Sequence, residues 1–210
     1  MQQTSDTIKY VGTEYGGFPV CLDLIEDGDV IYDIGVGEDI SFSEGVLEVK
    51  DCHIHLFDFT PQSIEWFKEN HSDREDMTFH EYGLSVTDGM MEIHHPEGSR
   101  RPAWLGFEHN ETWPTKKLKT IMDELGHDHI DVLKMDIEGE EYRVIHDIID
   151  SGIFPTQICM EFHERFLSDD NYQLHVDAIT RLKEHYELML VVHGQEALWI
   201  HNSIFESEDE

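Results

Sequence analysis

Lysine and arginine are scarce in this sequence. The 210 residues include 14 of them against 46 aspartates and glutamates, which gives a formal net charge of −32. Nucleic acids and anionic membranes are themselves polyanions, so this charge makes binding to either unfavourable. The acid is dispersed along the chain, as in proteins that work in concentrated salt, where screening over about 3 Å at 1 M suppresses self-repulsion. We therefore expect a halophilic protein, the alternative being an acidic protein from an organism of ordinary salinity.

Cysteine is also rare, with Cys21, Cys52 and Cys159 far apart and no CxxC pair. This pattern argues against a zinc or redox motif and indicates buried, reduced thiols. The 15 histidines do not occur at the spacing of a metal-ligand set. The sequence therefore predicts no metal site.

Long apolar runs are missing as well. No segment approaches the roughly 20 apolar residues of a membrane-spanning helix, and the first ten residues lack a basic region followed by an apolar one. These absences predict a cytoplasmic protein with no membrane partner.

The composition suits one domain. Apolar residues make up 39% of the chain, enough for one continuous core, and there are no internal repeats or Ser/Pro/Gly linkers. We therefore treat residues 1–210 as a single domain. Within it we distinguish an N-terminal segment (1–28), a polar loop or small hairpin (85–113) and a short acidic tail (205–210).

Short strand-like runs alternate with longer amphipathic ones. Residues 29–35 (DVIYDIG) precede a helix-like segment, and residues 53–59 (HIHLFDF) precede residues 60–71, where Thr60 and Pro61 suit a helix N-cap and first helical position. The last two apolar runs are separated only by "GQE", which is typical of an antiparallel hairpin. With right-handed crossovers, the pattern predicts an α/β fold: a doubly wound, mostly parallel sheet with a C-terminal antiparallel hairpin.

In such a fold, ligands bind at the carboxyl ends of the strands. The first strand ends in residues 33–39 (DIGVGED), whose glycines allow a tight turn, although Ile40 replaces the third glycine of a dinucleotide fingerprint. Asp33, Glu38 and Asp39 would repel a pyrophosphate but favour an ammonium or sulfonium group. The structural alternative is a solvated turn with Asp39 as a helix N-cap.

The second and third strands also end in residues that suit a nucleoside. Asp58 lies about 20 residues beyond the glycines, where an acid can accept both ribose hydroxyls, and Phe59 can pack on adenine. Leu84, near the end of the third strand, would lie beside the base or in the core. A positively charged nucleoside without phosphate fits these features, and S-adenosylmethionine is the common metabolite of that kind.

The fourth and fifth strands end in charge. Lys134, Asp136 and Glu138 alternate along an apparently extended run, and Glu161 and His163 do the same at the next strand. Adjacent parallel strands would bring Asp136, Glu138, Glu161 and His163 into one pocket, where an imidazole beside carboxylates can act on a hydroxyl. A charge network that only seals the sheet end is the alternative.

At these residues the sequence resembles the FkbM-like family of S-adenosylmethionine-dependent methyltransferases. The resemblance runs from Val11 to about His163 through "VGTEYGG", "YDIGVGEDISF", "HLFDFTPQSIEWF", "YGLSVTDG", "LKMDIEGEEYRVI" and "EFH". The most specific of these is "LKMDIEGEEY". The resemblance implies a class I methyltransferase fold, Rossmann-like, and methyl transfer, usually to a hydroxyl oxygen. Residues 100–115 match no motif of the family, so we expect acceptor specificity to reside there.

The resemblance also implies roles for individual residues. An N-terminal segment would close over the cofactor, the glycine turn would line its methionine part, Asp58 would hold the ribose and Leu84 would lie by the adenine. Four residues would lie near the acceptor. In that order the residues are Tyr15, Gly16 and Gly17; Asp33, Gly35, Gly37 and Glu38; Asp58; Leu84; and Asp136, Glu138, Glu161 and His163.

The leading hypothesis is therefore an S-adenosylmethionine-dependent O-methyltransferase that acts on a small-molecule or glycan hydroxyl. His163 or Asp136 would take the proton, and a metal held by Asp136 and Glu138 is an alternative that no visible ligand triad supports. A nicotinamide-dependent oxidoreductase is a second hypothesis, which the missing glycine and acidic turn disfavour. A non-catalytic binding module on the same fold is a third.

Overall fold

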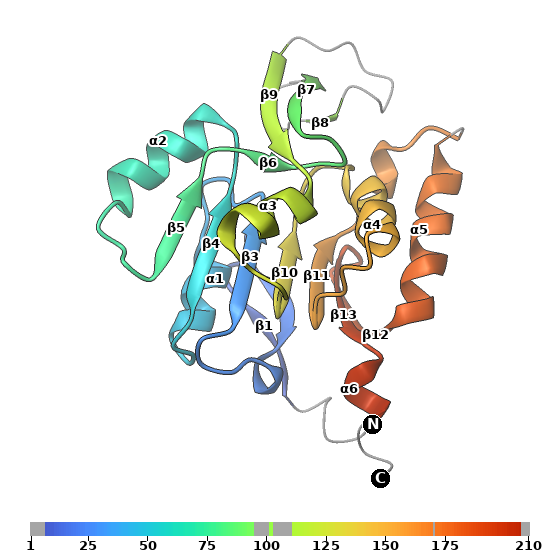
Figure 1. Cartoon of the computed structure of the whole chain (residues 1–210), viewed down its shortest axis with the longest axis horizontal. Coiled ribbons are helices and arrows are strands. Elements are labelled where there is room, and N and C mark those ends of the chain that lie inside the picture. The colour runs from blue at the N-terminus through green and yellow to red at the C-terminus, as the bar shows by residue number, and fades with distance from the viewer. Residues whose placement is uncertain (1–6, 95–100, 103–110, 170, 207–210) are drawn as a thin grey trace.

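The central sheet of the protein has seven strands in the order β12-β13-β11-β10-β3-β4-β5. The computed structural model describes residues 7–94, 101–102, 111–169 and 171–206 (Figure 1). Neighbouring strands from β11 to β5 are parallel, whereas β13 is antiparallel to both β11 and β12. The strands are β3 (Val30–Ile34), β4 (His53–Phe57), β5 (Met77–His80), β10 (Val132–Met135), β11 (Gln157–Glu161), β12 (Tyr186–Val192) and β13 (Glu196–His201). This order confirms the predicted doubly wound sheet and its C-terminal hairpin.

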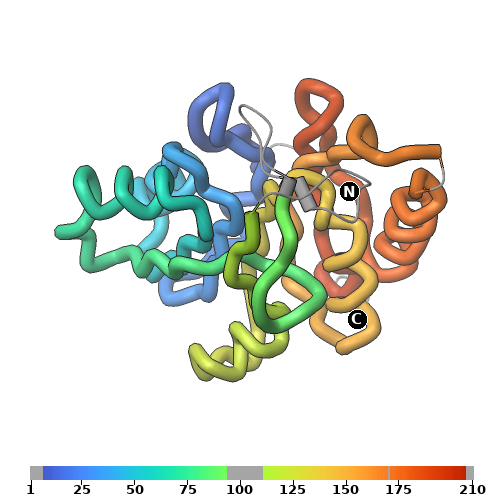
Figure 2. Tube along the Cα trace, turned by 90° about the horizontal axis from the view of Figure 1, so that it is seen from above, coloured from blue at the N-terminus to red at the C-terminus, as the bar shows by residue number. Residues whose placement is uncertain are grey.

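Helices cover the sheet on both faces. Side chains of α3, α4 and α5 form one core with the sheet, and those of α1, α2 and the N-terminal strands form the other. Figure 2 shows α3 and α4 on the opposite side of the sheet from the N-terminal hairpin. The helices are α1 (Ser41–Leu47), α2 (Pro61–Asn70), α3 (Leu118–Leu125), α4 (Glu141–Asp150), α5 (Tyr172–His185) and α6 (Ser203–Glu206), with short 3-10 turns at Leu22–Leu24 and Glu164–Phe166.

The helix-start signals agree with the structure at α2 and differ at α1. Thr60 is the N-cap of α2, its side chain accepts a hydrogen bond from the Ser63 amide, and a proline follows it. The helix-like segment after the first strand forms a helix only from Ser41 to Leu47. Asp39 accepts a hydrogen bond from the Ser41 amide but precedes the N-cap position, which Ile40 occupies.

The N-terminal segment folds into an antiparallel hairpin of β1 (Ile8–Val11) and β2 (Phe18–Cys21). The side-chain amide of Gln157 fixes it to β11, because its oxygen accepts from the Cys21 amide at 2.9 Å and its nitrogen donates to the Cys21 carbonyl at 3.1 Å. The hairpin therefore shares one core with the central sheet. Cys21 and the other two cysteines are buried free thiols, as predicted.

A second sheet lies beyond one end of the central sheet (Figure 1). Its strand order is β6-β9-β7-β8, with β7 and β9 antiparallel. The strands are β6 (Gly83–Leu84), β7 (Gly89–His94), β8 (Arg101–Pro102) and β9 (Glu111–Lys116). Most of the expected acceptor-specificity segment, residues 100–115, lies outside the described residues, and so does the end of the acidic tail. In the described part of the chain, no helix has the length and apolar composition to cross a membrane.

Candidate functional site

A cavity of about 400 Å³ opens at the carboxyl ends of β3, β4 and β10. The strand order reverses here, because β3 lies between β4 and β10, and such a switch point is where ligands bind in open α/β sheets. Nine of the predicted site residues line the cavity: Tyr15, Gly35, Gly37, Glu38, Asp58, Phe59, Leu84, Asp136 and Glu138. Six do not: Gly16, Gly17, Asp33, Asp39, Glu161 and His163.

Glycine is present at the two positions of the first turn for different physical reasons. Gly35 has φ +77°, and a Cβ there would lie 1.8 Å from the carbonyl oxygen of Asp136, so the close approach of two turns requires glycine. Gly37 has φ +56°, and a Cβ there would meet only the Tyr15 hydroxyl, at 3.7 Å. Gly37 therefore faces open space in the cavity. Its amide donates a hydrogen bond to a neighbouring carboxylate.

That carboxylate belongs to Asp58, which is buried and held at both oxygens. Oδ2 accepts from the Gly37 amide at 2.9 Å and Oδ1 accepts from the Thr60 amide at 2.7 Å. A carboxylate has about four lone-pair positions, so each oxygen retains capacity for one ligand donor. The arrangement holds this carboxylate fixed at the cavity, with acceptor capacity left on both oxygens.

An apolar slot adjoins Asp58. Phe59 stacks on Trp113 of the small sheet, with ring centroids 5.8 Å apart and an interplanar angle of 18°. A Cβ on Gly83 would lie 2.4 Å from the Phe59 ring, so glycine allows the ring to pack there, and buried Leu84 follows. The sequence did not identify Trp113, because its contact with Phe59 depends on how the small sheet folds back.

The acidic turn divides into one residue that faces the cavity and one that does not. Glu38 lines the cavity. Asp39 instead accepts from the Thr13 hydroxyl at 2.6 Å and the Ser41 amide at 2.7 Å. Burial opposes ionisation of Asp39, but these hydrogen bonds hold its pKa below the usual range. Asp39, which was predicted to contact the cofactor, does not line the cavity and instead anchors the N-terminal hairpin.

In that hairpin, only Tyr15 of the three predicted residues reaches the cavity, with 81% of its surface exposed. A Cβ on Gly16 would lie 2.6 Å from the Asp39 carboxylate carbon, and one on Gly17 would lie 2.4 Å from the Thr13 carbonyl oxygen. Glycine at these two positions therefore allows the tight packing of the loop.

Asp33, also predicted to contact the cofactor, does not line the cavity and lies beneath the turn. Its Oδ1 is 3.0 Å from Nζ of Lys134, with both side chains almost fully buried, and its Oδ2 accepts from the Ser43 hydroxyl at 2.7 Å. Lys134 Nζ also donates to the Gly35 carbonyl at 3.2 Å. The ion pair thus fixes the backbone that forms the cavity floor.

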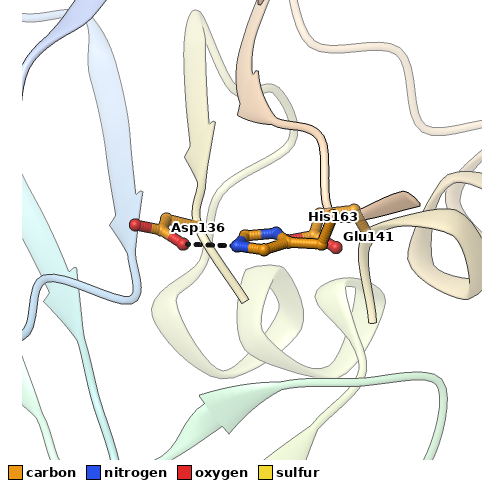
Figure 3. Close-up of side chains that lie close together, drawn as sticks. All are labelled: Asp136, Glu141 and His163. Atoms are coloured by element: carbon orange, nitrogen blue, oxygen red, sulfur yellow. Dashed lines mark hydrogen bonds and ion pairs between the residues drawn. The ribbon is translucent and has the colours of Figure 1, made fainter. Parts of the chain in front are cut away.

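Four carboxylates surround one imidazole beside the cavity, a group that we call the acidic cluster: Asp136, Glu138, Glu141, Glu161 and His163. His163 is 2% exposed, and its Nε2 lies 3.6 Å from Glu161, 3.7 Å from Asp136 and 3.9 Å from Glu138. Figure 3 shows the imidazole between Asp136 and Glu141. The structure therefore brings together all four residues predicted near the acceptor, although Glu161 and His163 lie behind Asp136 and Glu138.

Glu141 is the member that the sequence analysis missed. It is fully buried at the start of α4, where Oε1 accepts from the Ile137 amide at 2.9 Å and from His163 Nδ1 at 2.8 Å, and Oε2 accepts from the Gly139 amide at 2.8 Å. A turn, and not an extended strand, places it there.

The conformation of this turn corrects the predicted alternation. β10 ends at Met135, and Glu138 has a positive φ of 56°, which is uncommon for a residue with a side chain. Asp136 and Glu138 still both reach the cavity, but they do so from a turn. Strain of this kind is often found at functional sites.

Burial is the largest single influence on the pKa of Asp136, Glu138, Glu161 and His163. It raises the pKa of Asp136, of Glu161 and of Glu138, the last to about 7. Burial lowers the pKa of His163, but Glu141, Asp136 and Glu161 outweigh it and raise that pKa to about 9. The ligand atoms of Asp136, Glu141 and His163 lie within 4.8 Å of one another, so this part of the cluster has the composition of a metal site.

Glu140 is a further residue that the sequence analysis did not single out. It lines the cavity, although its side chain is buried, and it accepts a hydrogen bond from the Ser85 hydroxyl at 2.7 Å. This hydrogen bond connects the residue that follows β6 to the turn before α4.

Known proteins similar to this chain are methyltransferases or are described as related to them. A family model described as a methyltransferase domain matches residues 11–191. Two curated relatives, described as probable methyltransferase-like protein 24, align over 135 residues, with 27% identity for the Homo sapiens protein and 25% for the Rattus norvegicus protein. Each alignment covers 63% of this chain and 32% of the relative, so the chain spans about a third of their length.

Two solved structures share the fold. Methyltransferase FkbM from Methylobacillus flagellatus superimposes with a TM-score of 0.56 and 14% identity, covering 84% of this chain and 44% of that chain. A putative rRNA methylase from Clostridium thermocellum gives a TM-score of 0.50 and 7% identity, covering 86% and 89%. At these identities the similarity concerns the fold alone.

Proposed function

The chain belongs to the family of methyltransferase domains, and we propose that it transfers a methyl group from S-adenosylmethionine to a hydroxyl oxygen of a small molecule or glycan. The family match confirms the resemblance found in the sequence. The cofactor contacts and the class of acceptor remain proposals.

The position of Asp58 carries this proposal. Its carboxylate is fixed by the Gly37 and Thr60 amides at the end of the second parallel strand, where it can accept both hydroxyls of a ribose. The neighbouring turn presents Glu38 to the cavity, which favours a cation over a pyrophosphate. Phe59 and Leu84 provide an apolar slot for adenine.

The chemistry requires mainly positioning. The acceptor oxygen attacks the methyl carbon in line, the bond between carbon and sulfur breaks as the bond between oxygen and carbon forms, and S-adenosylhomocysteine leaves. The hydroxyl proton must pass to a base. Glu138 suits this role better than His163 because Glu138 lines the cavity, whereas His163 is buried behind it.

Calorimetry with S-adenosylhomocysteine and NAD tests the cofactor class. We expect S-adenosylhomocysteine to bind and NAD not to bind, and Asp58→Ala to weaken the binding by about tenfold or more, which is the worth of a charged hydrogen bond. Glu65→Gln, on the exposed surface of α2, is the matched control. Tight binding of NAD alone would identify an oxidoreductase instead.

A screen for methyl transfer to compounds of a cell extract tests the enzyme against the binding module. We expect transfer from labelled S-adenosylmethionine to a hydroxyl compound, and its loss in Glu138→Gln with cofactor binding intact. A protein that binds cofactor but methylates nothing in its own extract would support the binding-module hypothesis.

We also propose that the protein works in a salt-rich cytoplasm and has no nucleic-acid or membrane partner. The formal net charge of −32 supports both statements, because it repels polyanions and is tolerated best where salt screens it.

A further inference from the structure

We propose that the acidic cluster binds a divalent transition-metal ion through His163 Nε2 and the carboxylates of Asp136 and Glu161, beside the cavity. The sequence analysis predicted no metal site. The three proposed ligands follow two different strands, and their spacing in the sequence matches no known metal-binding motif. Metal binding itself is independent of the proposed function.

The orientation of His163 is the first reason. Both oxygens of Glu141 already accept hydrogen bonds from backbone amides, so Nδ1 of His163 is the donor to Oε1. A metal that displaces the second proton of this imidazole would therefore bind at Nε2, which faces Asp136, Glu138 and Glu161. Histidines that bind metals commonly donate their other nitrogen to a carboxylate in this way.

The same bonds show why Glu141 is not a ligand, although it lies close enough to be one. Both of its oxygens are engaged by protein donors within the turn, and a metal would have to displace them. Glu141 is therefore a positioning residue that fixes the imidazole, and Glu161 takes the third ligand position.

The convergence of oxygens on Nε2 is the second reason. His163 is 2% exposed, and Nε2 faces carboxylate oxygens of Glu161, Asp136 and Glu138 at 3.6 to 3.9 Å. Oε2 of Glu138 is buried and lacks a hydrogen-bond partner among the described residues. Buried polar atoms are normally paired, so this oxygen, 3.9 Å from Nε2 of His163, indicates a missing ligand beside them.

The separations fit a shared cation. Nitrogen and oxygen ligands lie about 2.0 to 2.2 Å from zinc, so two ligands of a tetrahedral site are roughly 3.3 to 3.6 Å apart. Nε2 of His163 lies 3.6 Å from Glu161 and 3.7 Å from Asp136, which needs a closure of only a few tenths of an ångström.

Charge points the same way. The nearest lysine, Lys134, is paired with Asp33 at 3.0 Å, and Arg165 reaches Glu161 only at 3.4 Å from the exposed side. A cation would offset the repulsion among the carboxylates. One imidazole with carboxylates favours Mn²⁺ or Zn²⁺ over Mg²⁺ or Ca²⁺, which prefer oxygen ligands alone.

The role of the ion rests on the proposed function. Asp136 belongs both to the ligand set and to the cavity lining, so an ion there would have an open position toward the cavity. That position can bind the hydroxyl oxygen of the acceptor and hold it in line with the methyl group, while Glu138 remains beside it to accept the proton.

Titration calorimetry of the chelator-treated protein with Mn²⁺ and Zn²⁺ tests the proposal in 1 M KCl, which screens unspecific association with the acidic surface. We expect one equivalent of at least one of the two ions to bind, without cofactor or acceptor. Asp136→Asn and Glu161→Gln should each weaken binding by tenfold or more, and Glu141→Gln by about 10- to 100-fold through the imidazole. Electron paramagnetic resonance of bound Mn²⁺ gives an independent readout.

The control is Glu65→Gln, which should bind the ion like the wild-type protein. Circular dichroism shows whether each variant is folded, and binding of S-adenosylhomocysteine by Glu161→Gln shows that the cofactor pocket is intact. The metal-site proposal would be overturned if neither ion bound the folded wild-type protein. It would also be overturned if Asp136→Asn and Glu161→Gln bound the ion as tightly as the wild-type protein does. Neither result would affect the proposed cofactor.

Discussion

Nδ1 of His163 lies 2.8 Å from Oε1 of Glu141, so the first residue of α4 fixes a side chain that follows β11. The two residues are 22 positions apart in the sequence, and both are buried. Through this bond the turn after β10 and the turn after β11 become one rigid unit at the edge of the sheet. The rest of the acidic cluster is built on that unit.

We expect Glu141→Ala to destabilise the protein by about 3 to 5 kcal/mol, because it leaves the His163 imidazole and two backbone amides without their buried partner. Glu141→Gln should cost less, since the amide oxygen can still accept from one or two of these donors. Urea unfolding measures both. Equal stability of Glu141→Ala and the wild-type protein would show that the unit is not held by this carboxylate.

Lys134 and Asp33 provide a second test of buried charge. We expect Lys134→Met to cost about 3 to 5 kcal/mol, because it leaves the Asp33 carboxylate unpaired in the core. Asp33→Asn in the same chain should restore part of the loss, since the uncompensated charge is then gone. A double-mutant cycle by urea unfolding measures the coupling, and strictly additive costs would contradict a direct interaction.

A group of histidines lies away from the cavity, on β4 and its neighbours. Nδ1 of His55 is 3.0 Å from Nε2 of His80, and the rings of His53 and His127 lie 5.1 Å and 5.0 Å from that of His55. Burial and these neighbouring histidines lower the pKa of His55 to about 3. Tyr32 completes the surroundings, with its hydroxyl 2.7 Å from His127 Nδ1.

His80 responds in the same direction. Its pKa is lowered to about 4 by burial, by Lys116 and by His53, against a smaller opposite effect of Glu124. Both folded-state values lie below the ordinary 6.5, so the unfolded chain binds more protons as the pH falls below about 6.5. Stability is therefore lost progressively from that pH downward, by at most about 1.4 kcal/mol per pH unit for each group.

We expect His55→Gln to reduce this loss. Urea midpoints of the wild-type protein and the variant, taken between pH 7.5 and 5, should converge as the pH falls, because the variant has no imidazole to protonate at that position. His71→Gln, at the end of α2 and outside this group, is the control and should follow the wild-type profile. Parallel profiles for His55→Gln and the wild type would contradict the assignment.

Salt provides the last prediction. We expect the melting temperature to rise with KCl into the molar range, because screening weakens the repulsion among dispersed carboxylates. A gain of 2 to 3 kcal/mol corresponds to roughly 5 to 10 °C for a chain of this size. Thermal unfolding at increasing KCl measures it. Maximal stability in dilute buffer would refute adaptation to salt. It would leave the methyltransferase hypothesis unchanged.

The strand ends were predictable because their chemistry is local. A parallel strand that is buried on both faces is an apolar run, so the polar residue that follows it stands out, as Asp58 and Asp136 do. The order of strands and helices then places such residues at one edge. For the same reason the sequence identified nine residues of the cavity lining.

The predicted residues that lie outside the cavity lining include acids engaged by partners far away in the chain. Asp33 carries the same charge as Glu38, but Lys134 draws it into the core. Asp39 follows Glu38 directly, but Thr13 engages it. Nothing in the residues next to these acids distinguishes a ligand contact from an internal ion pair or hydrogen bond.

The sequence by itself determined the alternation of strands and helices, the edge at which the site lies and the acidity of that edge, because these follow from hydrophobic period and residue type. Only the tertiary structure decided which carboxylates face the cavity and which form hydrogen bonds or ion pairs inside the protein. It also decided that Glu141 orients His163. Such choices depend on distances of a few ångströms between segments far apart in the chain, and the packing of the whole fold sets those distances.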